Sequence, residues 1–167
     1  LALCMAWMMA VAWLAFGSVF VVWNVFQSSG LDFRLVAAGA VAPVLLDAPW
    51  GGQAYAHTLL VATAVLVGAM AVTPGRRLRR RRALSLAIGW YASLVLGASW
   101  AHKELFWWPA FGSARPEVPM FGPWGLVVIE EIAGLAAARW AWVRFGLGDP
   151  HRRRTFLRSG RLAVVGS

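Results

Sequence analysis

The sequence predicts an all-α membrane protein, a bundle of about four transmembrane helices plus one short or re-entrant helix. Of its 167 residues, 60% are hydrophobic and only 14% are charged, whereas soluble domains are roughly half apolar and a quarter charged. The mean hydropathy is +0.63. The apolar residues fall in long runs, and clusters of arginine follow two of them. We therefore expect lipid to surround most of the chain.

The first predicted span is Ala2 to Phe26, which lies in a stretch without charged side chains. It is long enough to cross a hydrocarbon core of ~30 Å, and too long for a signal peptide. The next apolar run, Leu35 to Leu46, is only twelve residues long and contains Pro43. Its length favours a short or re-entrant helix, although a full crossing stays open.

Three further spans complete the predicted bundle. They are Ala54 to Val72, Ala83 to Ala101 and Trp124 to Val143. At this length we expect one transmembrane domain, residues 1–151, followed by a basic cytoplasmic tail, residues 152–167.

The formal charge of +9 comes mainly from two arginine clusters that follow apolar runs. Their members are Arg76, Arg77, Arg79, Arg80, Arg81, Arg82, Arg152, Arg153 and Arg154. This placement is typical of the positive-inside rule and suits contact with lipid headgroups, so we expect membrane lipids and no nucleic acid as partners.

These arginines also predict an orientation in a bacterial inner (plasma) membrane. If both clusters are cytoplasmic, and if Leu35 to Leu46 does not cross, the first span begins in the cytoplasm. Both termini of this multi-pass protein are then cytoplasmic, and Arg34 lies on the outer side.

Several ionisable side chains that remain lie toward the predicted outer side. Glu130 and Glu131 stand inside the last span, where carboxylates are costly. Neighbours on a helix point ~100° apart, so these two cannot face one partner directly. Each such residue singly suits an interfacial role, whereas together with nearby histidines they suit a metal or proton site. Cys4 is the only cysteine, which excludes an intrachain disulfide.

A set of short blocks carries a resemblance to a known family. The blocks are Leu31-Asp32-Phe33-Arg34-Leu35-Val36, Gly39 to Asp47, His57-Thr58-Leu59-Leu60, Gly89 to Trp100 and Leu105-Phe106-Trp107-Trp108-Pro109. In this order they resemble the YdjM-like membrane-bound metal-dependent hydrolases, over roughly half of the chain.

The resemblance implies metal ligands in three blocks of the form Pro-Asp-x-x-Asp, His before Thr or Ser, and His-Leu-x-x-Asp. Asp47 and His57 match this pattern, whereas Val44, Ser93 and Gly97 replace the other three ligands. Catalytic zinc sites use three protein ligands plus water, so two survivors are too few. Further ligands could come from a few nearby residues, namely His102, Glu104 or Glu130.

The leading hypothesis is thus a non-catalytic accessory or structural subunit of a larger membrane protein assembly, with other membrane subunits as partners and no cofactor. The alternative is a metal-dependent hydrolase that holds a divalent metal such as zinc and acts on a lipid or lipid-linked substrate at the outer interface. A third hypothesis is a lipid- or proton-handling transport component that uses Glu130 and Glu131, although the sequence shows no inverted repeat.

Overall fold

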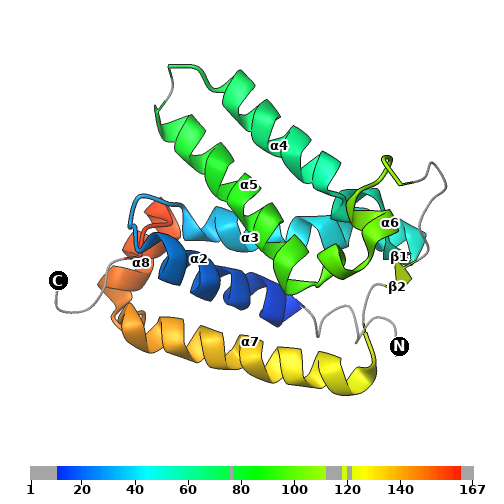
Figure 1. Cartoon of the computed structure of the whole chain (residues 1–167). Coiled ribbons are helices and arrows are strands. Elements are labelled where there is room, and N and C mark those ends of the chain that lie inside the picture. The colour runs from blue at the N-terminus through cyan, green and yellow to red at the C-terminus, as the bar shows by residue number, and fades with distance from the viewer. Residues whose placement is uncertain (1–10, 76, 112–117, 120–121, 163–167) are drawn as a thin grey trace.

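The computed structural model describes residues 11–75, 77–111, 118–119 and 122–162, and this part of the chain is mostly helical (Figure 1). The longer helices are α2 (Ser18–Phe26), α3 (Phe33–Asp47), α4 (Leu59–Val72), α5 (Arg77–Leu96), α7 (Trp124–Arg144) and α8 (Pro150–Ser159). The short elements are η1 (Trp13–Gly17), η2 (Ala48–Trp50), η3 (Tyr55–His57), η4 (Ser99–Ala101), α6 (Lys103–Phe106) and the antiparallel strands β1 (Gly52–Gln53) and β2 (Val118–Pro119). The predicted all-α class agrees with this helical content.

Helix α3 is at the centre of the bundle. Helix α5 packs along one side of it, and the continuous helix formed by η1 and α2 packs along another side. Helix α4 covers α5, and α7 lies along η1 (Figure 1). The α3–α5 contact depends on glycine. A Cβ atom on Gly39 would lie 2.1 Å from the Leu86 carbonyl oxygen, and one on Gly89 would lie 2.0 Å from the Val36 carbonyl oxygen. The two backbones therefore touch, because small residues allow helices to approach each other closely.

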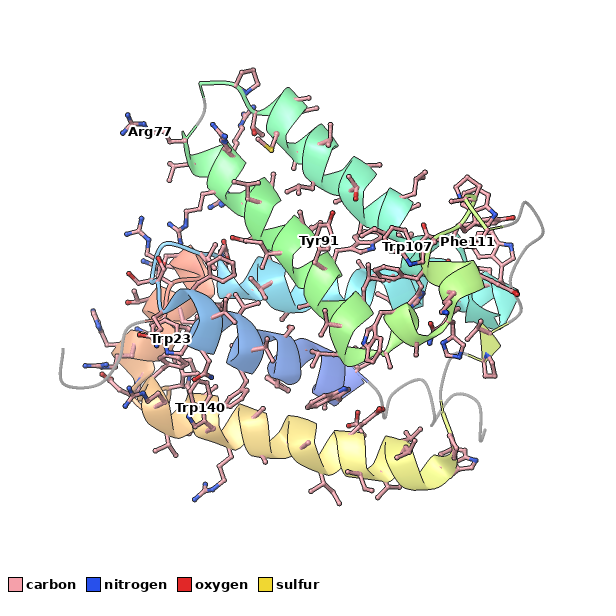
Figure 2. All side chains as sticks on the ribbon, in the orientation of Figure 1. Trp23, Arg77, Tyr91, Trp107, Phe111 and Trp140 are labelled. Atoms are coloured by element: carbon pink, nitrogen blue, oxygen red, sulfur yellow. The ribbon has the colours of Figure 1, made fainter. Side chains whose placement is uncertain are left out.

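The bundle has two chemically different ends. At the arginine end, which holds the start of α5 and all of α8, Arg81 donates from Nη2 to the Leu31 carbonyl at 2.9 Å. At the histidine end, Asp47 closes α3 and contacts His57. Figure 2 shows Arg77 on one side of the molecule, and Trp107 and Phe111 on the other.

Helix α3 connects these two ends. Asp32, directly before α3, donates its backbone N–H to Ser85 in α5 near the arginine end, whereas Asp47 lies at the histidine end. Arg34 donates to the Leu157 carbonyl in α8. The expectation that Arg34 lies opposite the arginine clusters is therefore wrong, because α3 runs the full length of the bundle.

The helix formed by η1 and α2 runs in the opposite direction to α3. Its Trp13 donates from the indole nitrogen to the Leu96 carbonyl at the histidine end, at 3.2 Å. Its Trp23 packs against Phe145 at the arginine end, with ring centroids 4.7 Å apart. The described start of the first helix thus lies at the end opposite α8. The predicted topology had the first span begin on the same side as the tail, and the difference arises because α3 runs from one end of the bundle to the other.

The helices differ in length from the predicted spans. One helical window of the described residues, Phe33–Trp50, is long and apolar enough to cross a membrane by length and composition, a test that the core helix of a soluble protein also passes. This window contains the segment for which the sequence favoured a short or re-entrant helix. The apolar helices Trp13–Phe26 and Leu59–Val72 are shorter. Residues 1–10, the beginning of the first predicted span, lie outside the described part, as do residues 163–167 of the predicted tail.

Candidate functional site

Asp47 and His57 meet at the histidine end of the bundle. Asp47 is the last residue of α3, and the turn that follows reverses through Gly51, whose φ of +72° suits glycine. This reversal brings His57, the last residue of η3, back onto α3. The Nδ1 atom of His57 lies 2.7 Å from Oδ2 of Asp47, and both side chains are buried.

The Asp47 carboxylate has two more partners in the same turn. Its Oδ2 atom accepts the backbone N–H of Ala54 at 2.7 Å, and its Oδ1 atom accepts the backbone N–H of Ala56 at 3.1 Å. Three donors from one segment therefore converge on one carboxylate. Because a buried carboxylate needs such compensation, this arrangement explains how Asp47 is accommodated and fixes the shape of residues 48–57.

The turn is also fastened to the end of α5. Trp90 donates its indole N–H to the Ala56 carbonyl at 2.9 Å, and the Ser99 hydroxyl donates to Oε1 of Gln53 at 3.1 Å. Ser99, Gln53 and Trp90 are all buried. The Asp47–His57 pair is thus part of a rigid polar cluster that joins α3, η3 and α5.

The three positions at which the resemblance implies further ligands contribute no charged group. Val44 packs against Leu14 in an apolar cluster. The Ser93 hydroxyl donates to the carbonyl of Trp90 in its own helix at 2.7 Å. Gly97 has no side chain. The structure therefore gives the Asp47–His57 pair no additional metal ligand from these positions.

The other proposed ligands do not complete a metal site with the pair. His102, directly before α6, and Glu104, within α6, are exposed, and Glu130 is half-buried in α7. Within residues 11–75, 77–111, 118–119 and 122–162, no three His, Cys, Asp or Glu side chains are close enough to hold a metal ion. The structure brings together only two of the five residues predicted as metal ligands.

The predicted headgroup-contacting arginines gather at the arginine end. The described members of the first cluster stand on the first turns of α5, and those of the second cluster near the start of α8. Most of them are exposed, whereas Arg81 and Arg152 are half-buried. Arg76 lies outside the described residues.

A second polar cluster, which the sequence did not reveal, surrounds Asp32 at the arginine end. Arg34 binds its carboxylate through two nitrogens, with Nε to Oδ1 at 3.1 Å and Nη2 to Oδ2 at 3.0 Å. Arg82 lies 3.9 Å from Oδ2. Burial by itself raises the pKa of Asp32, but the hydrogen bonds and charge of Arg34, together with backbone N–H groups, outweigh burial and leave its pKa below the ordinary value.

The same cluster fastens the end of α8 to the beginning of α3. Phe33 donates its backbone N–H to the Gly160 carbonyl at 2.9 Å. Gly160 has a φ of +66°, and a Cβ atom there would lie 1.7 Å from Oδ1 of Asp32. The spacing Asp-x-Arg at the start of a helix was the available sequence signal, but the partner Gly160 is 128 positions further along, since 160 − 32 = 128.

The chain matches no protein-family model, no curated protein and no solved structure.

Proposed function

We propose that this chain is a multi-pass helical protein of the bacterial inner (plasma) membrane and acts there as a non-catalytic accessory or structural subunit of a membrane protein assembly. Its scaffold resembles that of the YdjM-like membrane-bound metal-dependent hydrolases, with the hydrolytic site lost. The observation that carries this proposal is that the Asp47 carboxylate is held by three donors of its own chain.

A membrane location is supported by the outward surface of α7. Ile129, Ile132 and Leu135 are 63%, 62% and 61% exposed, and their spacing of three residues places them along one side of the helix. Exposed apolar side chains of this kind recur on α4, where Leu60, Val67, Met70 and Val72 are exposed. Contiguous apolar surface is unfavourable in water and favourable in hydrocarbon. We therefore place these surfaces against lipid and the arginine end at the cytoplasmic face.

A non-catalytic role is supported by the bonding of Asp47. Metal ligation through this carboxylate would compete with the N–H groups of Ala54 and Ala56, and these buried donors would then lose their acceptor. The pair therefore serves to hold the turn at the histidine end. A fixed turn of this kind, with exposed Trp100 and Trp107 beside it, is suited to contact other membrane subunits.

One observation favours the alternative, a metal-dependent hydrolase acting on a lipid or lipid-linked substrate at the outer interface. His57 directs Nδ1 toward Asp47, which leaves Nε2 as the nitrogen for a ligand. Metal-binding histidines commonly contact a carboxylate in this manner. In this alternative Asp47 orients the histidine, and the remaining ligands come from a second molecule or from the substrate.

Metal content distinguishes the two functions. The full chain is purified in mild detergent after growth with added zinc, and bound metal is measured per chain for wild type, His57→Ala and His151→Ala. His151, an exposed residue of α8, controls for adventitious binding by a single histidine. The accessory function predicts far less than one zinc per chain in all three proteins. One zinc per chain in wild type and in His151→Ala, lost in His57→Ala, would establish the hydrolase site and overturn the proposal.

The same preparation tests the assembly. We expect the wild-type chain to migrate in mild detergent as part of a larger complex with other membrane chains. In His57→Ala the complex should persist only if the turn stays folded. The melting temperature of this variant is therefore measured in parallel. A wild-type chain that is always recovered alone and monomeric would contradict the accessory role.

A further inference from the structure

An apolar groove lies at the arginine end. It is formed by the helix of η1 and α2 together with α3, α7 and α8. It encloses about 430 Å³, within the range of ~300–1,000 Å³ usual for small-molecule sites. Its walls are almost entirely apolar and include Phe16, Val19, Ala141, Trp142, Phe156 and Leu157. Figure 2 shows Trp23 and Trp140 on the helices around this region, next to α8. The volume and lining suit a hydrocarbon chain.

Two arginines, Arg34 and Arg153, contribute to the lining of this groove, almost entirely through the carbon atoms of their side chains. Arg34 is engaged with Asp32 and with the Leu157 carbonyl. Arg153 is exposed, and within the described residues its guanidinium makes no hydrogen bond or ion pair. An unpaired arginine at the rim of an apolar groove has its donors free for an external anion.

The surroundings carry an excess of positive charge. Burial and the positive charge of Arg161 lower the pKa of Arg81, so these two cations and Arg82 lie near one another. Asp32 is the carboxylate that Arg34 and Arg82 approach and whose charge acts on Arg81. One negative charge does not balance so many positive ones, and a bound anion would relieve the repulsion.

We propose that this groove binds one acyl chain of an anionic phospholipid, with the lipid phosphate at Arg153 and Arg34. Charge complementarity selects this occupant, because the walls take hydrocarbon and the rim takes an anion. Arg153 stands in the first turn of α8, so the headgroup would also lie near the positive end of that helix dipole. This inference rests on the membrane location proposed above and extends it to one specific lipid site.

The test uses the full chain, which is first reconstituted into vesicles of phosphatidylcholine in which about 20 mol% of the lipid is phosphatidylglycerol. This fraction mimics an anionic inner leaflet. Failure of the chain to insert would overturn the membrane location itself. Once insertion is shown, lipid retained after transfer to detergent is measured by native mass spectrometry. We expect phosphatidylglycerol to be retained in preference to phosphatidylcholine.

Two variants locate the headgroup. Arg153→Gln should reduce retention of phosphatidylglycerol about fivefold, the effect of one basic residue near an anionic lipid surface. Arg158→Gln removes the same charge from the same helix but does not line the groove, so retention should stay near the wild-type value. Equal losses in both variants, or equal retention of the two lipids by wild type, would overturn the site.

A third variant locates the acyl chain. Ala138 lines the groove and is half-buried, so Ala138→Phe should fill the space and abolish retention of phosphatidylglycerol. Its melting in detergent is compared with wild type, and Arg153→Gln supplies an independent result if Ala138→Phe is unstable. Full retention in a folded Ala138→Phe protein, or displacement of the lipid by free glycerol phosphate alone, would show that the groove holds no acyl chain.

Discussion

Replacement of Asp47 by alanine should be the most damaging single substitution at the histidine end. It removes the acceptor of three hydrogen bonds, from the N–H groups of Ala54 and Ala56 and from Nδ1 of His57. Each buried donor left without a partner costs about 1–3 kcal/mol. The three share one carboxylate, so the losses are not additive, and we expect a total of about 3–5 kcal/mol, as for other broken buried pairs.

This loss can be measured as a shift of the melting temperature in detergent. For a chain of this size, about 1 kcal/mol corresponds to roughly 2–4 °C, so Asp47→Ala should melt roughly 6–20 °C below wild type. Asp47→Asn keeps one acceptor oxygen and should lose less. Asp149→Ala is the matched control, because Asp149 accepts one exposed N–H, that of His151, at the start of α8. That variant should lose about 1 kcal/mol, the usual contribution of a helix cap.

The reasoning would be refuted if Asp47→Ala melted no lower than Asp149→Ala. Such a result would mean that the carboxylate does not hold the turn. It would also remove the support that this bonding gives to the accessory function, since Asp47 would then be free to bind a metal.

Three further predictions concern the arginine end and the helix contact. Gly160→Ala should destabilise the protein by about 2 kcal/mol or more, because alanine is strained at this positive φ and its Cβ would meet Asp32. Amide hydrogen exchange should become faster in α8 but not in α4, and exchange in α8 at the wild-type rate would contradict this prediction. Gly89→Ala should lower the free energy of unfolding, measured by denaturant titration, by about 1–3 kcal/mol because it forces α3 and α5 apart. Gly68→Ala is the control, since a Cβ atom there meets no atom within 4 Å, and it should not destabilise the chain. Equal effects of the two substitutions would argue against the close contact. Asp32→Asn should be less stable than wild type at pH 7, and this difference in stability should shrink as the pH falls. A carboxyl group whose folded-state pKa is lowered stabilises the fold above its unfolded pKa, and this contribution is lost as the pH falls through the folded pKa. A difference in melting temperature that stays constant between pH 7 and pH 3 (a range of about four units spanning the ordinary pKa of Asp) would contradict this.

The sequence predicted the helices best where apolar runs end in polar residues. The last predicted span, Trp124 to Val143, matches α7 (Trp124–Arg144) to within one residue. Helix α5 begins at Arg77 rather than at Ala83, because hydropathy excludes arginine from a span although arginine is a good helix former. Hydropathy locates the apolar part of a helix, and propensity decides where the helix starts.

The direction of α3 could not be derived from local sequence. Its length and Pro43 favoured a re-entrant segment, and its neighbour Arg34 was therefore assigned to the wrong end. The contacts that decide the matter join Asp32 to Ser85 and Phe33 to Gly160. Contacts between residues so far apart in the chain leave no periodic signal in the sequence.

The candidate site was predicted in part. Asp47 and His57 were identified together through the resemblance, and the structure places them in contact. The bonds from Ala54 and Ala56 to Asp47 could not be predicted, because backbone N–H groups occur at nearly every residue and only the fold decides which of them meet a carboxylate. These bonds support the proposed role of Asp47 as a structural acceptor.

The claim on which the membrane account depends most is that α3 crosses the bilayer and separates the arginine end from the histidine end. Single cysteines at the exposed positions Ser29, Arg79 and Ala101, in a Cys4→Ser background, can be labelled with an impermeant maleimide in intact spheroplasts and in inside-out vesicles. The account predicts that Ser29→Cys and Arg79→Cys react only in inside-out vesicles, and that Ala101→Cys reacts only in spheroplasts. Labelling of Ser29→Cys and Ala101→Cys from the same side would contradict it.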